Sequence, residues 1–219
     1  MNITNYPLRR GQWFEEPTAK KYVVWHATEG RTHYTPASGR PGRATTSIDA
    51  WNLDAIRVGA PYLVDRDGTV YRAFADTGWI YHLGIPGTHG RYDRASVAIE
   101  LANEGPLELD GDRLHAFGFN TPDTVYTGFH FAAEWRDRSY FAELDELQVD
   151  AAIELTLDVC RRNDIEPVFY YPSTTYDFPR CFQVATIVCH SNCRRDKLDL
   201  FLPDWVFQKI EAAGIRLQS

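Results

Sequence analysis

The stretch TIVCHSNCRRDKLDLF, residues 186–201, changes from apolar to polar at its fifth residue. Its first four residues, TIVC, form the kind of apolar run that makes a buried strand. His190 follows directly, and Lys197 and Asp199 come within the next nine residues. Imidazole and carboxylate groups bind metals and carry protons. The stretch therefore predicts a strand whose end carries chemistry.

A second apolar run, residues 22–25, ends at His26 in the same way. Two imidazoles and one carboxylate suit zinc and leave a fourth position for water, so His26, His190 and Asp199 form a candidate ligand set. The histidines are 164 positions apart, and only neighbouring strands would bring them together. Each histidine is also consistent with a local hydrogen bond at a strand end. Asp199 is also consistent with a surface carboxylate or the N-cap of a following helix.

Apolar periodicity and turn residues predict the other elements. Strands are expected at residues 22–25, 96–102 and 181–190, helices at 47–59, 143–165 and 203–215, and hairpins around Asp67-Gly68 and Asp110-Gly111. Strands alternating with helices predict an α/β fold, a single domain with a central mixed β-sheet flanked by helices. The apolar helix faces are expected to contain Ile48, Trp51, Ala55 and Ile56 in the first helix, and Leu147, Ala151, Ile153, Leu155, Leu157 and Val159 in the second.

The domain organisation is expected to be simple. Residues 1–20 are interpreted as an irregular N-terminal lead-in, and residues 21–219 as the domain itself. A loop rich in Gly, Pro, Ser and Thr is expected over residues 30–46. Residues from about 104 to 142 are rich in aromatic side chains but have no clean period, so we interpret them as an excursion that would wall a binding groove.

Composition excludes several classes of protein. A net charge of −7 argues against a nucleic-acid binder, which carries a basic face. No apolar run is long enough for a membrane span, and the N-terminal residues lack the apolar core of a secretory signal. We expect a protein that is cytoplasmic as synthesised and would reach a cell wall through lysis or dedicated export. At least three of the four cysteines are expected to be reduced thiols, with Cys160 and Cys189 buried, while Cys193 in the polar segment stays open.

Four segments, in order, resemble the zinc-dependent N-acetylmuramoyl-L-alanine amidase family, which includes phage endolysin amidases, muropeptide-recycling amidases and peptidoglycan recognition proteins. They are VVWHATEG at residues 23–30, YLVDRDGTVYRAFADTGWIYHLG at 62–84, SVAIELANEGPL at 96–107 and VCHSNCRRDKLDLF at 188–201. The resemblance implies an amidase-like catalytic domain over residues 21–219. Its substrate would be peptidoglycan or a muropeptide, cleaved between the lactyl group of N-acetylmuramic acid and L-alanine.

Site roles follow from the resemblance residue by residue. It implies zinc bound by His26, His190 and Asp199, with Glu100 near the attacking water. Lys197 would lie beside the developing oxyanion, and His82 would be a wall of the site or a substrate contact. The chemistry agrees, because zinc makes water acidic, a carboxylate can transfer the proton and an ammonium group stabilises a tetrahedral oxygen.

Several alternatives stay open at this point. Glu100 is equally consistent with a strand carboxylate paired with Arg94, Lys197 with one more charge in a solvated basic cluster, and His82 with an ordinary loop histidine. The family usually continues Lys-x-Asp-Pro-Gly, whereas this chain reads KLDLF, and Cys193 is an alternative metal ligand. Some members of the family keep the groove without the metal, so a non-catalytic peptidoglycan-binding module is the alternative function.

Overall fold

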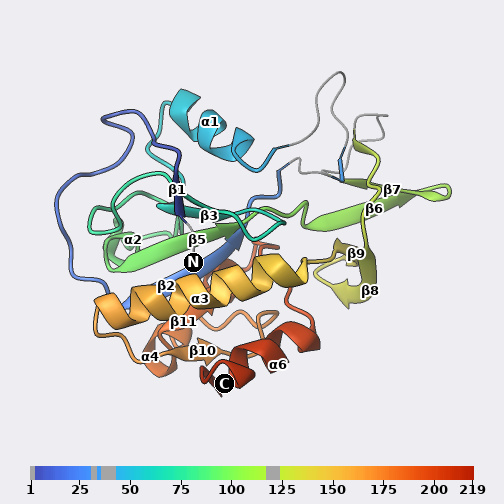
Figure 1. Cartoon of the computed structure of the whole chain (residues 1–219). Coiled ribbons are helices and arrows are strands. Elements are labelled where there is room, and N and C mark those ends of the chain that lie inside the picture. The colour runs from blue at the N-terminus through green and yellow to red at the C-terminus, as the bar shows by residue number, and fades with distance from the viewer. Residues whose placement is uncertain (1–2, 31–33, 36–42, 117–123) are drawn as a thin grey trace.

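An eight-stranded mixed sheet forms the centre of the protein, as the computed structural model of residues 3–30, 34–35, 43–116 and 124–219 shows (Figure 1). Its strand order is β1-β4-β3-β5-β2-β11-β10-β12, and every neighbouring pair is parallel except β3 and β4. The strands are β1 (Ile3–Asn5), β2 (Tyr22–Ala27), β3 (Tyr62–Val64), β4 (Val70–Arg72), β5 (Ser96–Leu101), β10 (Val168–Tyr170), β11 (Ile187–Cys189) and β12 (Arg216–Gln218).

Helices cover both faces of this sheet. On one face, the long α3 and the C-terminal α6 pack against the side chains of Val23, Trp25 and Ile99 in the largest core cluster. On the other face, α1 and α4 contribute to two smaller clusters that contain Leu63, Val24 and Val188. The helices are α1 (Thr46–Leu53), α2 (Arg91–Arg94), α3 (Glu146–Arg162), α4 (Cys181–Val184), α5 (His190–Cys193) and α6 (Asp204–Ala212). The expected single α/β domain with a flanked mixed sheet is confirmed.

Alternation along the strands decides which face receives the site residues. Trp25 and Ile99 point into the core beneath α3, so the next residues, His26 and Glu100, point to the opposite face. The two are register partners in the parallel pair β2 and β5. β11 lies on the other side of β2, and His190 is the first residue after it. Three neighbouring strands therefore bring these side chains together.

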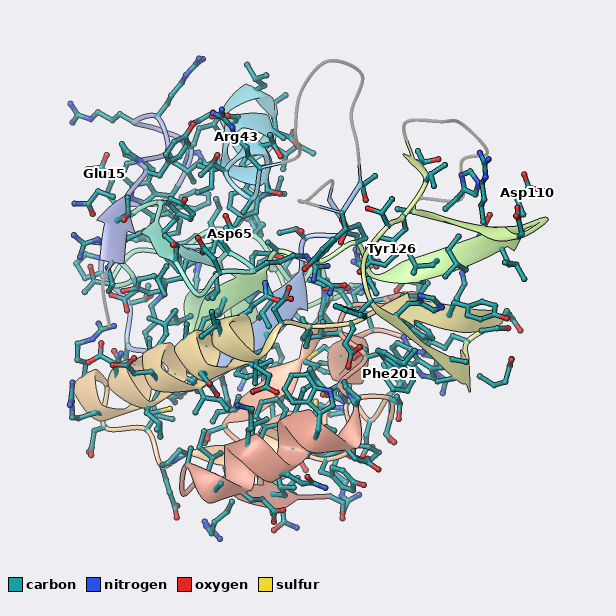
Figure 2. The ribbon with its side chains drawn as sticks, turned by 45° about the vertical axis from the view of Figure 1, so that its right-hand side comes forward. Glu15, Arg43, Asp65, Asp110, Tyr126 and Phe201 are labelled. Carbon is teal, nitrogen blue, oxygen red and sulfur yellow. The ribbon has the colours of Figure 1, made fainter. Side chains whose placement is uncertain are left out.

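A second sheet stands beside the first. It is antiparallel in the order β7-β6-β9-β8 and comprises β6 (Pro106–Asp110), β7 (Arg113–Ala116), β8 (His130–Trp135) and β9 (Arg138–Ala142). Asp110 lies at its far tip (Figure 2). The hairpin expected around Asp110-Gly111 is confirmed, and the aromatic remainder of the excursion forms strands β8 and β9. Residues 117–123 of the excursion lie outside the described residues, as does most of the loop expected at 30–46.

The strand expected over residues 181–190 is wrong in its first half. Only Ile187–Cys189 is a strand, and Cys181–Val184 forms the helical turn α4. Cys181 and Phe182 are both buried in the same core cluster. Consecutive residues of a strand would face opposite sides of the sheet, whereas a helical turn can bury both on one side.

Other local expectations also need correction. The lead-in is not irregular throughout, because Ile3–Asn5 pairs in parallel with β4 as the edge strand β1. Leu147 is exposed because α3 instead buries Gln148, whose amide donates to the carbonyls of Val64 and Ala102 at the ends of β3 and β5. Ile56 is exposed because α1 ends at Leu53.

The structure confirms several other predictions. The hairpin at Asp67-Gly68 joins β3 to β4, and the two later helices form close to their predicted bounds. All four cysteines are free thiols and buried. None of the helices in the described ranges combines the length and apolarity needed to cross a membrane.

Candidate active site

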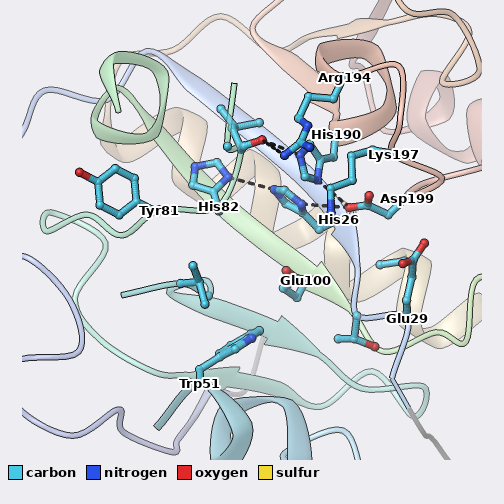
Figure 3. A pocket seen from close by; sticks show the side chains of 16 residues that line it. His26, Glu29, Trp51, Tyr81, His82, Glu100, His190, Arg194, Lys197 and Asp199 are labelled. Carbon is cyan, nitrogen blue, oxygen red and sulfur yellow. Dashed lines mark hydrogen bonds and ion pairs between the residues drawn. The ribbon is translucent and has the colours of Figure 1, made fainter. Parts of the chain in front are cut away.

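Two imidazoles and a carboxylate meet at the ends of β2 and β11 (Figure 3). The Nδ1 atoms of His26 and His190 lie 3.1 and 3.0 Å from the same oxygen of Asp199, Oδ2. One ligand atom from each residue lies within 4.8 Å of the other two, and all three residues are buried. The set expected from the sequence is thus assembled. Asp199 is not the N-cap of α6, a position that Pro203 occupies.

A chain of hydrogen bonds fixes the tautomer of His26. The Ser96 hydroxyl donates to the carbonyl of Tyr92 at 2.7 Å, so its oxygen accepts from Nε2 of His82 at 2.8 Å. His82 Nδ1 is then an acceptor, and His26 Nε2 donates its proton to it at 3.0 Å. Burial lowers the pKa of His26 to about 4, so the ring is neutral at pH 7. Its remaining nitrogen, Nδ1, therefore offers a lone pair.

His190 is oriented in the same sense by a different partner. Its Nε2 donates to the carbonyl of Leu83 at 2.9 Å, which leaves Nδ1 as the ring nitrogen that faces Asp199. Both imidazoles thus direct Nδ1 at the same carboxylate oxygen. Burial alone would raise the pKa of Asp199, but attraction to the two imidazoles and hydrogen bonds with them hold it below its usual range. The other oxygen of Asp199, Oδ1, is buried without a hydrogen-bond partner among the described residues.

This donor set fits a divalent metal ion. Two imidazole nitrogens and one carboxylate oxygen at these distances form a ligand set that zinc prefers. Hydrogen bonds from the second ring nitrogen of each histidine are the usual support of a zinc ligand. Cys193, the alternative ligand, lies outside this set, and its thiol donates to the carbonyl of Cys189.

Glu100 stands next to His26 on the neighbouring strand and lines the same pocket, which has a volume of about 330 Å³. Its Oε2 is enclosed without a hydrogen-bond partner in the described part of the chain. Burial, reinforced by the charge of Asp199, raises the pKa of Glu100 well above its ordinary value. Arg94 does not pair with it, because that guanidinium lies over the ring of Trp79. A carboxyl group so perturbed beside a candidate metal site is suited to proton transfer.

Cationic and aromatic side chains complete the pocket. Lys197 enters from the loop that leads to Asp199, and Arg194 lies on the same rim (Figure 3). Trp51 and Tyr81 line the opposite part of the pocket. His82 also lines it, although both of its ring nitrogens are engaged by His26 and Ser96. No described residue of the excursion lines this pocket.

Glu29 is a second carboxylate in the pocket that the sequence analysis did not single out. It lies in the segment HATEG, three positions after His26, and its backbone has a φ of +44°, in the left-handed region. Such a conformation is uncommon for a residue other than glycine. Burial and the charge of Asp199 raise the pKa of Glu29 to about 7. The signal available in the sequence was its position three residues after His26, a candidate metal ligand.

Glu29→Gln is expected to stabilise the metal-free protein above pH 7. Because the pKa of Glu29 rises from 4.5 in the unfolded chain to about 7 in the folded one, stability is lost as pH rises between these values. Glutamine carries no charge, so the variant should gain about 1–2 kcal/mol above pH 7, allowing for partial exposure, and nothing below pH 4.5. Urea unfolding in the presence of a chelator measures this difference. An equal gain at both pH values would contradict the assignment.

Comparison with known proteins identifies the family. The sequence profile of N-acetylmuramoyl-L-alanine amidases matches residues 16–199, and the chain belongs to this family of peptidoglycan amidases. No curated protein sequence matches the chain closely enough to count as a relative. The fold nevertheless recurs in solved structures of the same class of hydrolase.

Three of these structures have low sequence identity but cover nearly the whole chain. The amidase AmiD from E. coli, in complex with anhydro-N-acetylmuramic acid-L-Ala-D-gamma-Glu-L-Lys, has a TM-score of 0.54 at 19% identity over 95% of this chain and 62% of its own. The amidase LysC from Clostridium intestinale gives 0.51 at 14% identity over 99% of both chains. PlyL gives 0.51 at 12% identity over 98% of this chain and 91% of its own. The expected amidase class is confirmed.

Proposed function

We propose that this protein is a zinc-dependent amidase that hydrolyses the bond between the lactyl group of N-acetylmuramic acid and L-alanine in peptidoglycan or muropeptides. One observation carries the proposal. Nδ1 of His26, Nδ1 of His190 and Oδ2 of Asp199 converge, while Nε2 of each ring is engaged by His82 or by the carbonyl of Leu83. A carboxyl oxygen of Glu100 that has no hydrogen-bond partner among the described residues lies in the same pocket.

The three converging residues would hold the zinc ion. Bound there, zinc would supply Lewis acidity and make water acidic enough to attack at neutral pH. His82 and the carbonyl of Leu83 keep the second nitrogen of each imidazole protonated, so that the ligand nitrogens stay directed at the ion. This support places His82 behind a ligand, and a direct contact of His82 with substrate stays a prediction from the family resemblance.

Glu100 is proposed to transfer the proton. Its carboxylate accepts a proton from the attacking water as the oxygen bonds to the carbonyl carbon, and then donates it to the alanine nitrogen as the C–N bond breaks. The products are the muramic acid carboxylate and a peptide with a free amino terminus. Lys197 is proposed to stabilise the oxyanion on the carbonyl, because its ammonium group enters the same pocket as a fixed positive charge.

The test compares metal-free and zinc-loaded protein on soluble muropeptides and on purified cell wall. We expect one zinc ion per chain and release of stem peptides with a new amino terminus only after zinc is added. Mass spectrometry identifies the cleaved bond. If the zinc-loaded protein binds muropeptides without releasing peptide, it is a binding module on the same fold. If it contains no zinc at all, the ligand assignment fails as well.

A further inference from the structure

The turn of the β8–β9 hairpin reaches from the second sheet to the loop that carries Lys197 and Asp199. This two-residue turn consists of Arg136 and Asp137, with φ values of +48° and +61°. Such turns need left-handed backbone at both positions and usually contain Asn or Gly. Arginine is poorly suited to this backbone, so its presence here points to a role for its side chain.

The guanidinium group of Arg136 binds three backbone carbonyls of that loop. Nη2 donates to Ser191 O at 3.0 Å, and Nη1 donates to Arg194 O at 3.1 Å and to Lys197 O. These carbonyls receive no hydrogen bond from any other side chain in the described part of the molecule. The face of the guanidinium lies 4.7 Å from the ring of Trp135. The guanidinium group is thus in contact with Trp135 of the hairpin and hydrogen-bonded to three carbonyls of the loop.

The loop begins and ends at metal-ligand candidates. His190 precedes it, Asp199 closes it, and Ser191 N donates to Asp199 O at 2.8 Å. The orientation of Asp199 therefore depends on how the loop backbone between these two residues is held.

The residues after Asp199 are anchored by the same hairpin. The ring of Phe201 packs against Phe131, Trp135 and Phe141, with centroid distances of 5.2, 5.4 and 4.8 Å. Phe201 lies at the base of the second sheet (Figure 2). The second sheet therefore contacts the loop on both sides of the ligand, by hydrogen bonds before Asp199 and by aromatic packing after it.

We infer that Arg136 is a positioning residue of the active site, and that the β8–β9 hairpin acts as a clamp on the ligand loop. The planar guanidinium group of Arg136 binds three carbonyls at once, holding Asp199 toward the two imidazoles and Lys197 in the pocket. Lysine cannot reproduce this contact, because its three N–H donors share one nitrogen and do not form a planar fork. The functional part of this inference rests on the proposed zinc hydrolase, whereas the clamp itself does not.

The experiment compares Arg136→Ala and Arg136→Lys with a matched control, Arg138→Ala. Arg138 is in the same hairpin, but its guanidinium pairs with Glu108 and not with the loop. We expect zinc affinity, measured by chelator competition without substrate, to fall 10- to 100-fold in Arg136→Ala and less in Arg136→Lys. We expect kcat to fall with little change in KM, and millimolar guanidinium ion to restore part of it in Arg136→Ala only. The control should behave as wild type.

Hydrogen exchange of residues 191–199 in the metal-free protein separates the clamp from the proposed function. Faster exchange in both Arg136 variants, with unchanged exchange in Arg138→Ala, supports the clamp even if wild type proves inactive. If Arg136→Ala does not fold, Arg136→Lys decides. The inference is overturned if Arg136→Lys has the same hydrogen exchange, zinc affinity and kcat as the wild type. It is also overturned if the Arg138→Ala control loses as much zinc affinity and kcat as the Arg136 variants.

Discussion

His26→Ala is expected to abolish stoichiometric zinc binding and to lower kcat/KM for muropeptides about 10³-fold or more. The substitution removes one of the three proposed zinc ligands and leaves Nδ1 of His82 without its donor. A metal that acts as Lewis acid contributes several kcal/mol, and every 1.4 kcal/mol is a factor of ten in rate. Metal analysis after gel filtration and the rate of stem-peptide release measure the two effects. A variant that keeps one zinc per chain and its activity would show that the ion binds elsewhere.

His82→Leu is expected to have a smaller effect than His26→Ala. Leucine removes the acceptor for Nε2–H of His26 but leaves all three ligands in place. If His82 only orients His26, zinc affinity should fall 10- to 100-fold and the rate should recover at saturating zinc. If His82 contacts the substrate, as the family resemblance implies, KM should stay raised however much zinc is added. The two roles are thus separated by one titration.

Local sequence signals predicted the parts of this fold that depend on local physics. Apolar runs predicted β2, β5 and β11, and Asp67-Gly68 predicted the β3–β4 hairpin, because strand alternation and turn conformation are properties of a few neighbouring residues. The site residues at the strand ends were predicted from their types and from the ordered family resemblance. Their convergence depends on β5, β2 and β11 being neighbours in the sheet. The separations of these residues along the chain do not reveal that order.

The errors arose where tertiary contacts decide the structure. Gln148 is buried in α3 because two strand-end carbonyls need a donor, and a hydrophobicity pattern cannot represent that need. Arg136 was not singled out from the sequence, since its three acceptors belong to a loop 55 to 61 positions away. Both residues supply hydrogen bonds to distant backbone groups. Partners of this kind are visible only once the fold is known.

Glu100→Gln is expected to lower kcat by a factor of about 10² to 10⁴ while zinc affinity stays close to that of wild type. Glutamine is nearly the same size as glutamate but cannot accept the proton of the attacking water. It also removes a charge that burial and Asp199 make unfavourable, so the metal-free variant should unfold at a higher urea concentration than wild type. Kinetics at saturating zinc should show the fall in kcat. Urea unfolding with a chelator should show the gain in stability.

Lys197→Met provides the comparison that assigns these losses to chemistry. Methionine keeps much of the apolar stem and removes the ammonium group, so kcat should fall about 10²- to 10³-fold with zinc still bound. A modest loss in Glu100→Gln, less than tenfold, would contradict its role as the proton carrier and direct attention to Glu29, the other carboxylate of the pocket. The double variant Glu29→Gln/Glu100→Gln would then decide, because activity that survives Glu100→Gln through Glu29 must disappear when both carboxylates are gone.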